Sequence, residues 1–348
     1  MECARTSREV SAALRRHARR APSLTALGLA CSLAAAAASA QDQPVTFTRS
    51  ADQIEISIAG KPFSTYFFDP KIAKAYLQPL RSAEGTIVTR GFPLGDVIPP
   101  ENRHDPNLEP HQRPMYFAHG NIDGYDFWGE EVFVKFYGRD VSPHYGRMVF
   151  RKLDEMNGGP HSGTIEAEFD LTGGDHIPIA EETQQYTFAG TGDTRTIDCT
   201  FVIHANHGPV RMGDTKEGTF AIRVAQELDS PPGRMVNSAG GEGEPQIWGK
   251  QANWVDYDGV VGGEKVGIAI FDSPKSFRHP TYWHARAYGL FAANPFGLKE
   301  FTRDRHQDGS YTIPAGQSIT FRYRVLIHHG DYKEAKVAEA YEEYAAQP

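Results

Sequence analysis

Side chains capable of chemistry are concentrated in three segments of the 348-residue chain, at residues 109–130, 204–223 and 278–297. All three combine histidine, charged residues and aromatic rings. Imidazole can donate or accept a hydrogen bond, transfer a proton or bind a metal near neutral pH. A lysine beside a carboxylate can hold that carboxylate ionised or tune it as an acid or base. The catalytic candidates selected on this basis are His111, His119, Glu217 and His284.

The other polar and aromatic side chains of these segments suit the binding of a sugar. Aromatic faces stack on the C–H patches of a sugar ring and planar donors bind its hydroxyl groups, and small-molecule sites combine such an apolar wall with a few placed polar groups. Structural alternatives stay open, because the rings can belong to the core and the His, Asp, Lys and Glu side chains can cap turns or end a hairpin. The candidate substrate-binding residues are Arg113, Trp128, Lys216, Arg223, Trp283, Arg286, Tyr288 and Asn294.

A metal site is a further alternative, although the strong motif spacings are absent from the sequence. The chain has no His-Glu-x-x-His motif, no Gly-x-Ser-x-Gly motif and no phosphate-binding loop. We predict no cofactor. His328-His329 is a weaker candidate feature, which faces either the same pocket or solvent. A site for a divalent metal would require the convergence of His111, His119, His204 and His207.

The elements that must position these segments are short strands. Many of them alternate apolar and polar residues, which buries one face of a strand and exposes the other. Many strands with few helices are typical of a β-sandwich, and only residues 332–346 have a helical pattern. A long loop at residues 92–113 leads into the first segment, and a loop of that length is expected to serve function. Thirteen strands are predicted at residues 45–49, 53–58, 86–90, 132–137, 145–153, 163–171, 184–189, 194–203, 218–224, 246–256, 265–272, 311–313 and 317–327, and a short one at 115–118.

The first 40 residues have the pattern of a secretory signal peptide. An arginine-rich head precedes an apolar run rich in Ala and Leu, and Ala38-Ser39-Ala40 forms a small-x-small cleavage site before Gln41. The apolar run is shorter than the about 20 residues of a membrane span. We therefore predict a signal peptide at residues 1–40 and a single β-sandwich domain at residues 41–348, periplasmic or secreted, without a membrane span after cleavage.

Charge and cysteine content restrict the partners and the means of stabilisation. The net charge is −8 and no basic run follows residue 40, which argues against nucleic acid or an anionic membrane as partner. Cys3 and Cys31 would leave with the signal peptide, so Cys199 could form no internal disulfide. Cys199 lies in a strand-like run, and we expect it to be a small core residue.

Three long motifs span much of the predicted domain. They are Pro110-His111-Gln112-Arg113 with Phe117-Ala118-His119-Gly120 and Asp126-Phe127-Trp128-Gly129, then Asp214-Thr215-Lys216-Glu217-Gly218, and finally Arg278-His279-Pro280 with Trp283-His284 and Gly289-Leu290-Phe291-Ala292-Ala293-Asn294-Pro295-Phe296-Gly297. Together they resemble the PmoA-like family of exported bacterial proteins, often labelled methane oxygenase PmoA, over about residues 55–330. The sequence departs from that family at Gln112, where a second His is usual, and at Pro114, where Gly is usual.

The resemblance implies an exported β-sandwich protein of polysaccharide-degrading bacteria, and its label implies a metal-dependent oxidoreductase. We predict an all-β fold, a large β-sandwich that resembles the galactose-mutarotase-like supersandwich, with a short C-terminal helix. The predicted function is that of a carbohydrate-active hydrolase, lyase or epimerase, in which His119 or His284 transfers a proton with Glu217 as partner. The alternatives are a non-catalytic carbohydrate-binding protein and the oxidoreductase.

Overall fold

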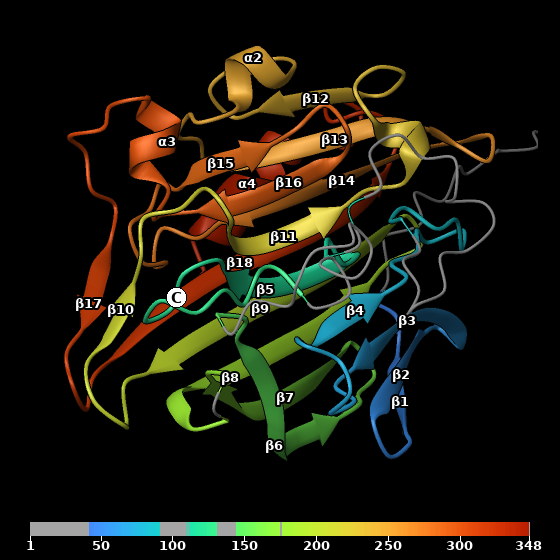
Figure 1. Ribbon diagram of the computed structural model, residues 1–348. Coiled ribbons are helices and arrows are strands. Elements are labelled where there is room, and N and C mark those ends of the chain that lie inside the picture. Colours follow the sequence, from blue (N-terminus) through green and yellow to red (C-terminus); the bar gives the residue numbers. More distant parts are fainter. Residues whose placement is uncertain (1–41, 91–108, 110, 131–143, 175, 348) are drawn as a thin grey trace, which may run out of the picture. The chain divides into compact units, whose positions relative to one another are not determined.

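Two antiparallel eight-stranded sheets form the folded part of the chain in this computed structural model (Figure 1). The structure describes residues 42–90, 109, 111–130, 144–174 and 176–347. The predicted signal peptide at residues 1–40, most of the predicted loop at 92–113 and the predicted strand at 132–137 lie outside these residues. The strands and the short C-terminal helix confirm the predicted all-β class.

The first sheet collects strands from both ends of the chain. Its order is β1-β2-β3-β4-β5-β11-β16-β15. The bounds of these strands are Val45–Arg49 for β1, Gln53–Ile58 for β2, Lys61–Phe67 for β3, Tyr76–Gln78 for β4, Met115–His119 for β5, Gly218–Arg223 for β11, Leu290–Asn294 for β16 and Tyr282–Ala285 for β15.

The second sheet contains the longest strands, in the order β12-β13-β14-β18-β9-β8-β7-β6. Its strands are β12 (Arg234–Asn237), β13 (Trp254–Val261), β14 (Glu264–Asp272), β18 (Ser318–His329), β9 (Thr194–His204), β8 (Pro178–Gly190), β7 (Ser162–Thr172) and β6 (Arg147–Asn157). A separate two-stranded ribbon pairs β10 (Val210–Met212) with β17 (Tyr311–Ile313).

Helices are few and short among the described residues. They are the 3₁₀ turn η2 (Gln226–Leu228) and the α-helices α2 (Glu244–Ile247), α3 (Leu298–Thr302) and α4 (Val337–Ala345). No helix in the described part of the chain is long and apolar enough to cross a membrane. The predicted strand at residues 246–256 is wrong in its first half. Helix α2 begins at Glu244 instead, with Pro245 in its first turn, where proline is favoured.

The core lies between the two sheets. Phe117 of β5 stacks on Phe201 of β9 with ring centroids 4.3 Å apart, and Phe220 of β11 stacks on Tyr323 of β18 at 4.9 Å. Cys199 is buried in the same core, as predicted. Aromatic packing of this kind stabilises a fold beyond the area it buries.

Strands β5, β11 and β16 are buried along their whole length. Residues opposite one another on neighbouring strands share a face, and successive residues alternate between faces. Phe117, Phe220, Ala293 and Trp283 form a row that faces the core, because Phe117 pairs with Phe220, Phe220 with Ala293 and Ala293 with Trp283. The residues that alternate with them along each strand therefore form a second row on the opposite face of the sheet. In β5, β11 and β16 these residues are buried as well.

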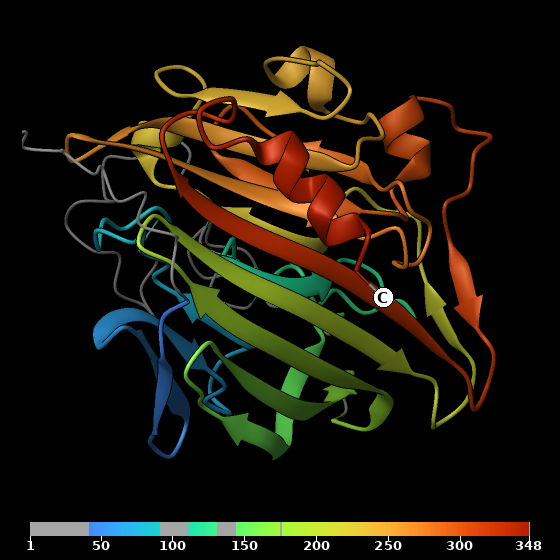
Figure 2. The same ribbon diagram turned by 180° about the vertical axis from the view of Figure 1, so that it is seen from behind.

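The C-terminal segment covers the outer face of the second sheet, and Figure 2 shows α4 lying across it. Val337 and Tyr341 of α4 pack with Ala269, Phe271 and Leu326 in an apolar cluster separate from the main core. Tyr341 meets the ring of Phe271 edge-on, with centroids 5.7 Å apart. The helix therefore packs on the sheet as predicted.

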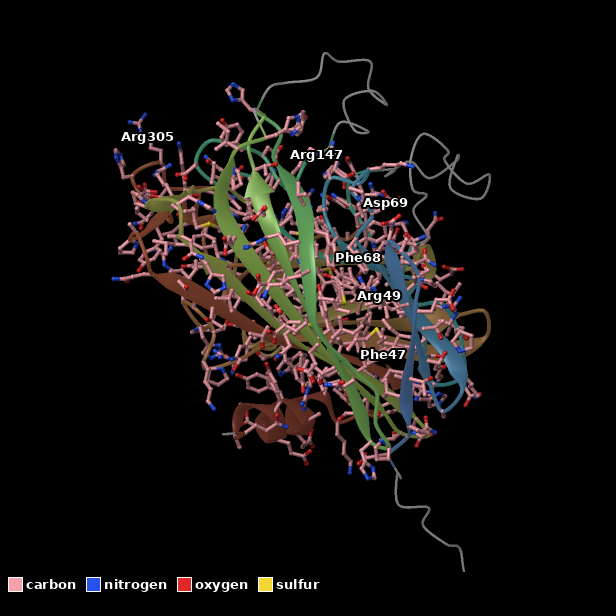
Figure 3. All side chains as sticks on the ribbon, turned by 90° about the horizontal axis from the view of Figure 1, so that it is seen from below. Phe47, Arg49, Phe68, Asp69, Arg147 and Arg305 are labelled. Carbon is pink, nitrogen blue, oxygen red and sulfur yellow. The ribbon has the colours of Figure 1, made fainter. Side chains whose placement is uncertain are left out.

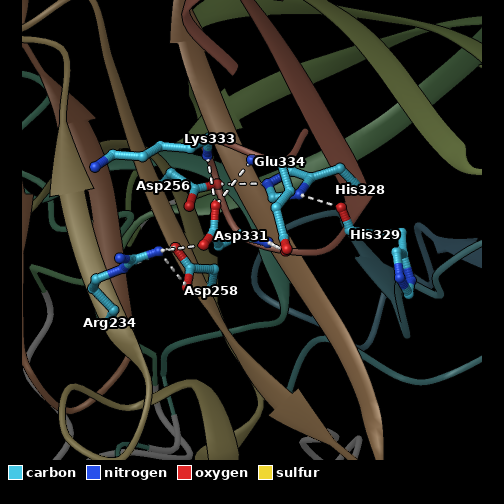
Figure 4. Close-up of polar contacts among 8 residues, drawn as sticks. All are labelled: Arg234, Asp256, Asp258, His328, His329, Asp331, Lys333 and Glu334. Carbon is cyan, nitrogen blue, oxygen red and sulfur yellow. Dashed lines mark hydrogen bonds and ion pairs between the residues drawn. The ribbon is translucent and has the colours of Figure 1, made fainter. Parts of the chain in front are cut away.

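A charged cluster lies on the same outer face (Figure 4). His328 Nε2 is 2.9 Å from Asp256 Oδ2, and both side chains are almost completely buried. Arg234 bridges Asp258 at 3.0 Å and Asp331 at 3.5 Å. His328 therefore faces neither the sugar-binding candidates nor open solvent, which corrects both alternatives considered for it.

Candidate functional site

A cavity of about 420 Å³ opens on the face of the first sheet that is turned away from the second sheet. Its volume lies in the range of small-molecule sites, roughly 300–1,000 Å³. Parts of all three segments selected from the sequence meet here. The residues that line this main cavity are Glu109, His111, Gln112, Asp126, Trp128, Gly129, Tyr145, Lys216, Glu217, His284, Arg286 and Tyr288.

The sheet register explains why His284 reaches the cavity. Tyr116 pairs with Ala221, Ala221 with Ala292, and Ala292 with His284, so that these residues form one row on the outward face. Ala221 and Ala292 are small, and they leave space above the sheet. His284 stands at the end of this row.

His284 is held in one tautomer. Its Nδ1 is 2.9 Å from the Lys216 carbonyl oxygen, which can only accept, so Nδ1 carries the proton and Nε2 keeps a lone pair. Nε2 is buried and has no hydrogen-bond partner among the described residues. Burial lowers the pKa of His284 to about 4, although the nearby Glu217 carboxylate opposes this change. The ring is therefore neutral at neutral pH.

Lys216 and Glu217 lie beside this ring. Glu217 Oε2 is 3.9 Å from His284 Nδ1, and Lys216 Nζ donates to Glu217 Oε1. Burial alone would lower the pKa of Lys216, but the Glu217 carboxylate raises it above the usual value. The backbone N–H of Lys216 donates to Glu300 Oε2 at 2.7 Å, which ties this pair to helix α3.

Aromatic rings and cations form the wall of the cavity. Trp128 packs on Tyr116 with centroids 4.9 Å apart, and its Nε1 has no hydrogen-bond partner in the described part of the chain. The Tyr288 ring lies 4.7 Å from the guanidinium of Arg223 and 5.3 Å from that of Arg286. Arg223 also donates to the Gln112 side chain. Arg223 therefore holds two lining residues, Gln112 and Tyr288, in place.

A buried ion cluster holds the Trp128 segment in place. Arg113 donates through Nε and Nη2 to the two oxygens of Glu130, with Nε 2.9 Å from Oε1. Lys74 Nζ is 3.2 Å from Glu130 Oε1 and also donates to the Trp128 carbonyl oxygen. Arg113 is thus a support of the site rather than part of the cavity lining.

His111 lines the main cavity but is surrounded by cations. Burial lowers its pKa well below the usual value, and Lys74 and Arg223 lower it further. Its Nδ1 is 3.7 Å from Glu109 Oε2. The ring is neutral at neutral pH.

Three predicted site residues lie elsewhere. His119 is on the core-facing side of β5, where Nε2 bonds the Gly213 carbonyl oxygen at 2.8 Å and the ring packs on Phe296. Trp283 faces the core and donates to the Ala252 carbonyl oxygen at 2.9 Å. Asn294 donates to the Thr215 carbonyl oxygen and accepts from the Phe296 N–H. Strand alternation explains the first two cases, because a shift of one residue moves a side chain to the other face.

The histidines considered for a metal do not come together. His204 lies on the second sheet between Thr183, at 3.0 Å, and Ser318, at 2.9 Å. His207 is 3.6 Å from Glu181. Among the described residues, no three His, Cys, Asp or Glu side chains are grouped as metal ligands, so the suggested ligand set does not fit a shared ion.

Some lining residues were not among the candidates. Gln112, Asp126 and Tyr145 face the main cavity. Asp126 Oδ1 accepts from the N–H groups of Trp128 and Gly129 at 2.9 and 2.8 Å, which shapes the turn that presents Trp128. Asp126 lies within the first selected segment, but Tyr145 follows it in the chain and has no sequence signal of its own.

Comparison with known proteins places the chain in a family. A sequence model of the family of unknown function DUF6807 matches residues 53–342. The chain belongs to the DUF6807 family. This DUF6807 match covers all three segments that form the site, and the resemblance to the PmoA-like family stays a prediction beside it. No curated protein sequence matches this DUF6807 chain.

Three solved structures are similar to this DUF6807 protein at low sequence identity. A galactose mutarotase-like protein from Clostridium acetobutylicum is 10% identical, with 83% of this chain and 99% of that chain covered and a TM-score of 0.40. The α-galactosidase AgaB from Geobacillus stearothermophilus is 12% identical, with 84% and 42% covered and a TM-score of 0.38. A galactose mutarotase-like protein from Lactobacillus casei is 9% identical, with 82% and 100% covered and a TM-score of 0.35.

Proposed function

We propose that the main cavity binds a carbohydrate and that His284, with Glu217 as its partner, transfers a proton during a reaction on that sugar. The observation that carries the proposal is the state of His284. It is a neutral imidazole fixed by the Lys216 carbonyl oxygen, with an unpaired Nε2 and a carboxylate beside its other nitrogen. A base oriented by a second group is the arrangement that proton transfer requires.

The walls of the cavity support a sugar as the ligand. Tyr145 and Tyr288 are half-buried rings of the lining that can contact the C–H patches of a pyranose, and the more deeply buried Trp128 lines the same wall. Asp126, Gln112 and Arg286 offer acceptors and donors for its hydroxyl groups. A few polar groups set in an aromatic wall give both orientation and specificity.

The proton transfer follows from the geometry of His284. Nε2 accepts a proton from a sugar hydroxyl or from a carbon beside a carbonyl group, and the ring becomes an imidazolium. Glu217, 3.9 Å from Nδ1, stabilises that positive charge by its opposite charge. The same pair returns the proton to the product. Epimerisation, elimination and hydrolysis all contain such a step. The signal-peptide pattern further supports the proposal that the protein acts in the periplasm or outside the cell.

The proposal is tested with His284→Gln and Glu217→Gln. Wild-type protein should bind a mono- or oligosaccharide in titration calorimetry and convert it in a time course followed by ¹H NMR. Either substitution should lower kcat by about 100-fold or more and change Kd only slightly. The rate of the wild type should fall as the pH drops through the His284 pKa of about 4, since the protonated ring is no longer a base.

His306→Gln is the matched control, because His306 is exposed and does not line the main cavity. It should keep wild-type rates. If the wild type binds sugar but never converts it, and the two variants bind as well as the wild type, the protein is a non-catalytic carbohydrate-binding protein. Absence of sugar binding by the wild type would overturn the proposal as a whole.

A further inference from the structure

A second cavity, of about 790 Å³, shares a wall with the main cavity. Its lining includes Glu244, Trp248, Lys250, Arg286, Phe301 and Arg303. Arg286 lines both cavities. The ring of His284, which lines the main cavity, lies 6.5 Å from the ring of Phe301. The two cavities are therefore adjacent, as neighbouring subsites of one oligosaccharide must be.

Helix α3 contacts residues that line both cavities. Its Glu300 accepts the hydrogen bond from the Lys216 backbone, beside His284. Its Phe301 stacks on Tyr282 with centroids 5.8 Å apart. Arg303 follows the helix directly. The position of the second cavity is thus fixed relative to the proton-transferring pair.

The second cavity has an excess of positive charge. Three cations line it, Lys250, Arg286 and Arg303, against one carboxylate, that of Glu244. Glu244 is already engaged, because Oε1 is 3.0 Å from Arg286 Nε and Oε2 accepts from the Ala287 N–H at 2.7 Å. Neither Lys250 nor Arg303 has an acidic partner among the described residues. Two cations are therefore available for an anion.

An aromatic surface lies next to these cations. Trp248 and Phe301 meet edge to face with centroids 5.6 Å apart, and the Arg303 guanidinium is 5.8 Å from the Trp248 ring. Trp248 Nε1 is buried and has no hydrogen-bond partner in the described part of the chain. A buried donor without a partner in an open cavity is a candidate contact for a ligand.

We infer that the second cavity is a subsite for a negatively charged sugar unit, so that the ligand is an acidic oligosaccharide. The inference rests on the proposed function of the main cavity, which would hold the reacting unit. Lys250 and Arg303 would bind the anionic group, and Trp248 would stack on the ring that carries it. A uronate carboxylate and a sulfate ester have this chemistry in common.

Three trisaccharides of equal length test the inference by titration calorimetry. They are a galactose trisaccharide, a galacturonic acid trisaccharide and a galactose trisaccharide with one sulfate ester. At least one acidic trisaccharide should bind about tenfold more tightly than the neutral one, and the preferred one identifies the anion. Arg303→Gln and Lys250→Gln should each remove most of this preference without weakening the binding of the neutral trisaccharide.

Arg305→Gln is the matched control. Arg305 is exposed, does not line the cavity and lies at the edge of the molecule in Figure 3, so its loss should leave the preference unchanged. If neutral and acidic trisaccharides bind equally well, the inference is wrong and the proposed function stands. If the preference survives in both cavity variants, the anion binds elsewhere and the inference also fails. If neither a trisaccharide nor a monosaccharide binds, the proposed function itself is wrong, and the inference fails with it.

Discussion

At the scale of single residues, His119 and His284 show that burial does not identify a catalytic histidine. Both rings are buried, and burial lowers the pKa of each to about 4. His284 keeps an unpaired Nε2 and lines the main cavity. His119 uses Nε2 to hold the Gly213 carbonyl oxygen on the core side of the same sheet. Their surroundings, rather than their residue type, separate a proton carrier from a structural residue.

Replacement of His119 should therefore change stability and leave binding intact. His119→Ala removes a buried hydrogen bond and a ring packed on Phe296, which should lower the free energy of unfolding by about 2–4 kcal/mol. Urea denaturation measures this loss, and calorimetry should give an unchanged sugar Kd for the folded variant. A large loss of sugar affinity with unchanged stability would show that His119 contacts the ligand after all.

Glu130 should be one of the residues most sensitive to substitution. Burial alone would raise its pKa, but Arg113 and Lys74 lower it below the usual value. Glu130→Gln leaves two buried cations without their counter-charge and should cost about 3–5 kcal/mol in urea denaturation. In the wild type, this stabilisation is present above the unfolded-state pKa and is lost as the pH falls through the lower folded-state pKa. Glu55→Gln, on an exposed position of β2, should have no measurable effect. A cost below about 1 kcal/mol for Glu130→Gln would contradict the expectation.

At the scale of elements, the alternation of apolar and polar residues predicted the strands that have one face exposed to solvent. Strand β9 alternates strictly between buried and half-buried residues, and β8 does so after its first residue. Strand β9 was predicted to within one residue, whereas only the second half of β8 was predicted. Strands β15 and β16 were missed, because both are short and neither alternates between apolar and polar residues; all their residues except the half-buried Tyr282 are buried. The face of a site residue therefore could not be derived from its segment, and this is why Trp283 and His119 were assigned to the site.

The charged cluster next to α4 should make stability depend on pH. Burial disfavours the charged form of His328, but the Asp256 carboxylate outweighs this effect and raises the pKa of His328. Burial and the charge of Asp256 raise the pKa of Asp258 to about 6. The folded state therefore binds protons more tightly than the unfolded state at both groups. The contribution of Asp258 should be lost as the pH rises from about 4 to about 6, and that of His328 as the pH rises from about 6.5 to above its folded-state pKa.

His328→Gln tests this dependence, because it removes the titrating group and keeps a hydrogen-bonding side chain near Asp256. Urea denaturation at several pH values between 5.5 and 9 should show a lower stability at pH 6 and a weaker pH dependence than in the wild type. The neighbouring His329 is exposed, so His329→Gln should behave as the wild type. Equal pH profiles for wild type and His328→Gln would refute the role assigned to the cluster.

At the scale of the whole molecule, the site depends on strands that are distant in the sequence. Strand β5 pairs with β11, β11 with β16 and β16 with β15, which brings parts of residues 111–130, 216–217 and 284–288 to one cavity. The composition of each segment predicted that the segment contributes to a functional site. Their convergence required the strand order of the sheet, which no single segment contains. Residues with a wholly local role, such as Cys199, were correctly predicted from their own strand.

The boundary of the folded unit leads to a prediction about the mature chain. The first backbone hydrogen bonds donated by the described residues come from Gln43, whose N–H donates to the Gly190 carbonyl oxygen at 2.9 Å, and from Val45, whose N–H donates to the Gly159 carbonyl oxygen at 2.9 Å. Both follow the predicted cleavage site directly. Mass spectrometry of exported protein should therefore give an N-terminus at Gln41. A chain that starts at residue 41 should match the full-length chain in its urea midpoint, because it keeps all of β1. A chain that starts at residue 50 lacks β1, exposes the apolar edge of β2 and should unfold at a clearly lower urea concentration.

A mature N-terminus beyond Val45, or equal midpoints for the chains starting at 41 and 50, would show that β1 is dispensable and that the folded domain begins later than proposed.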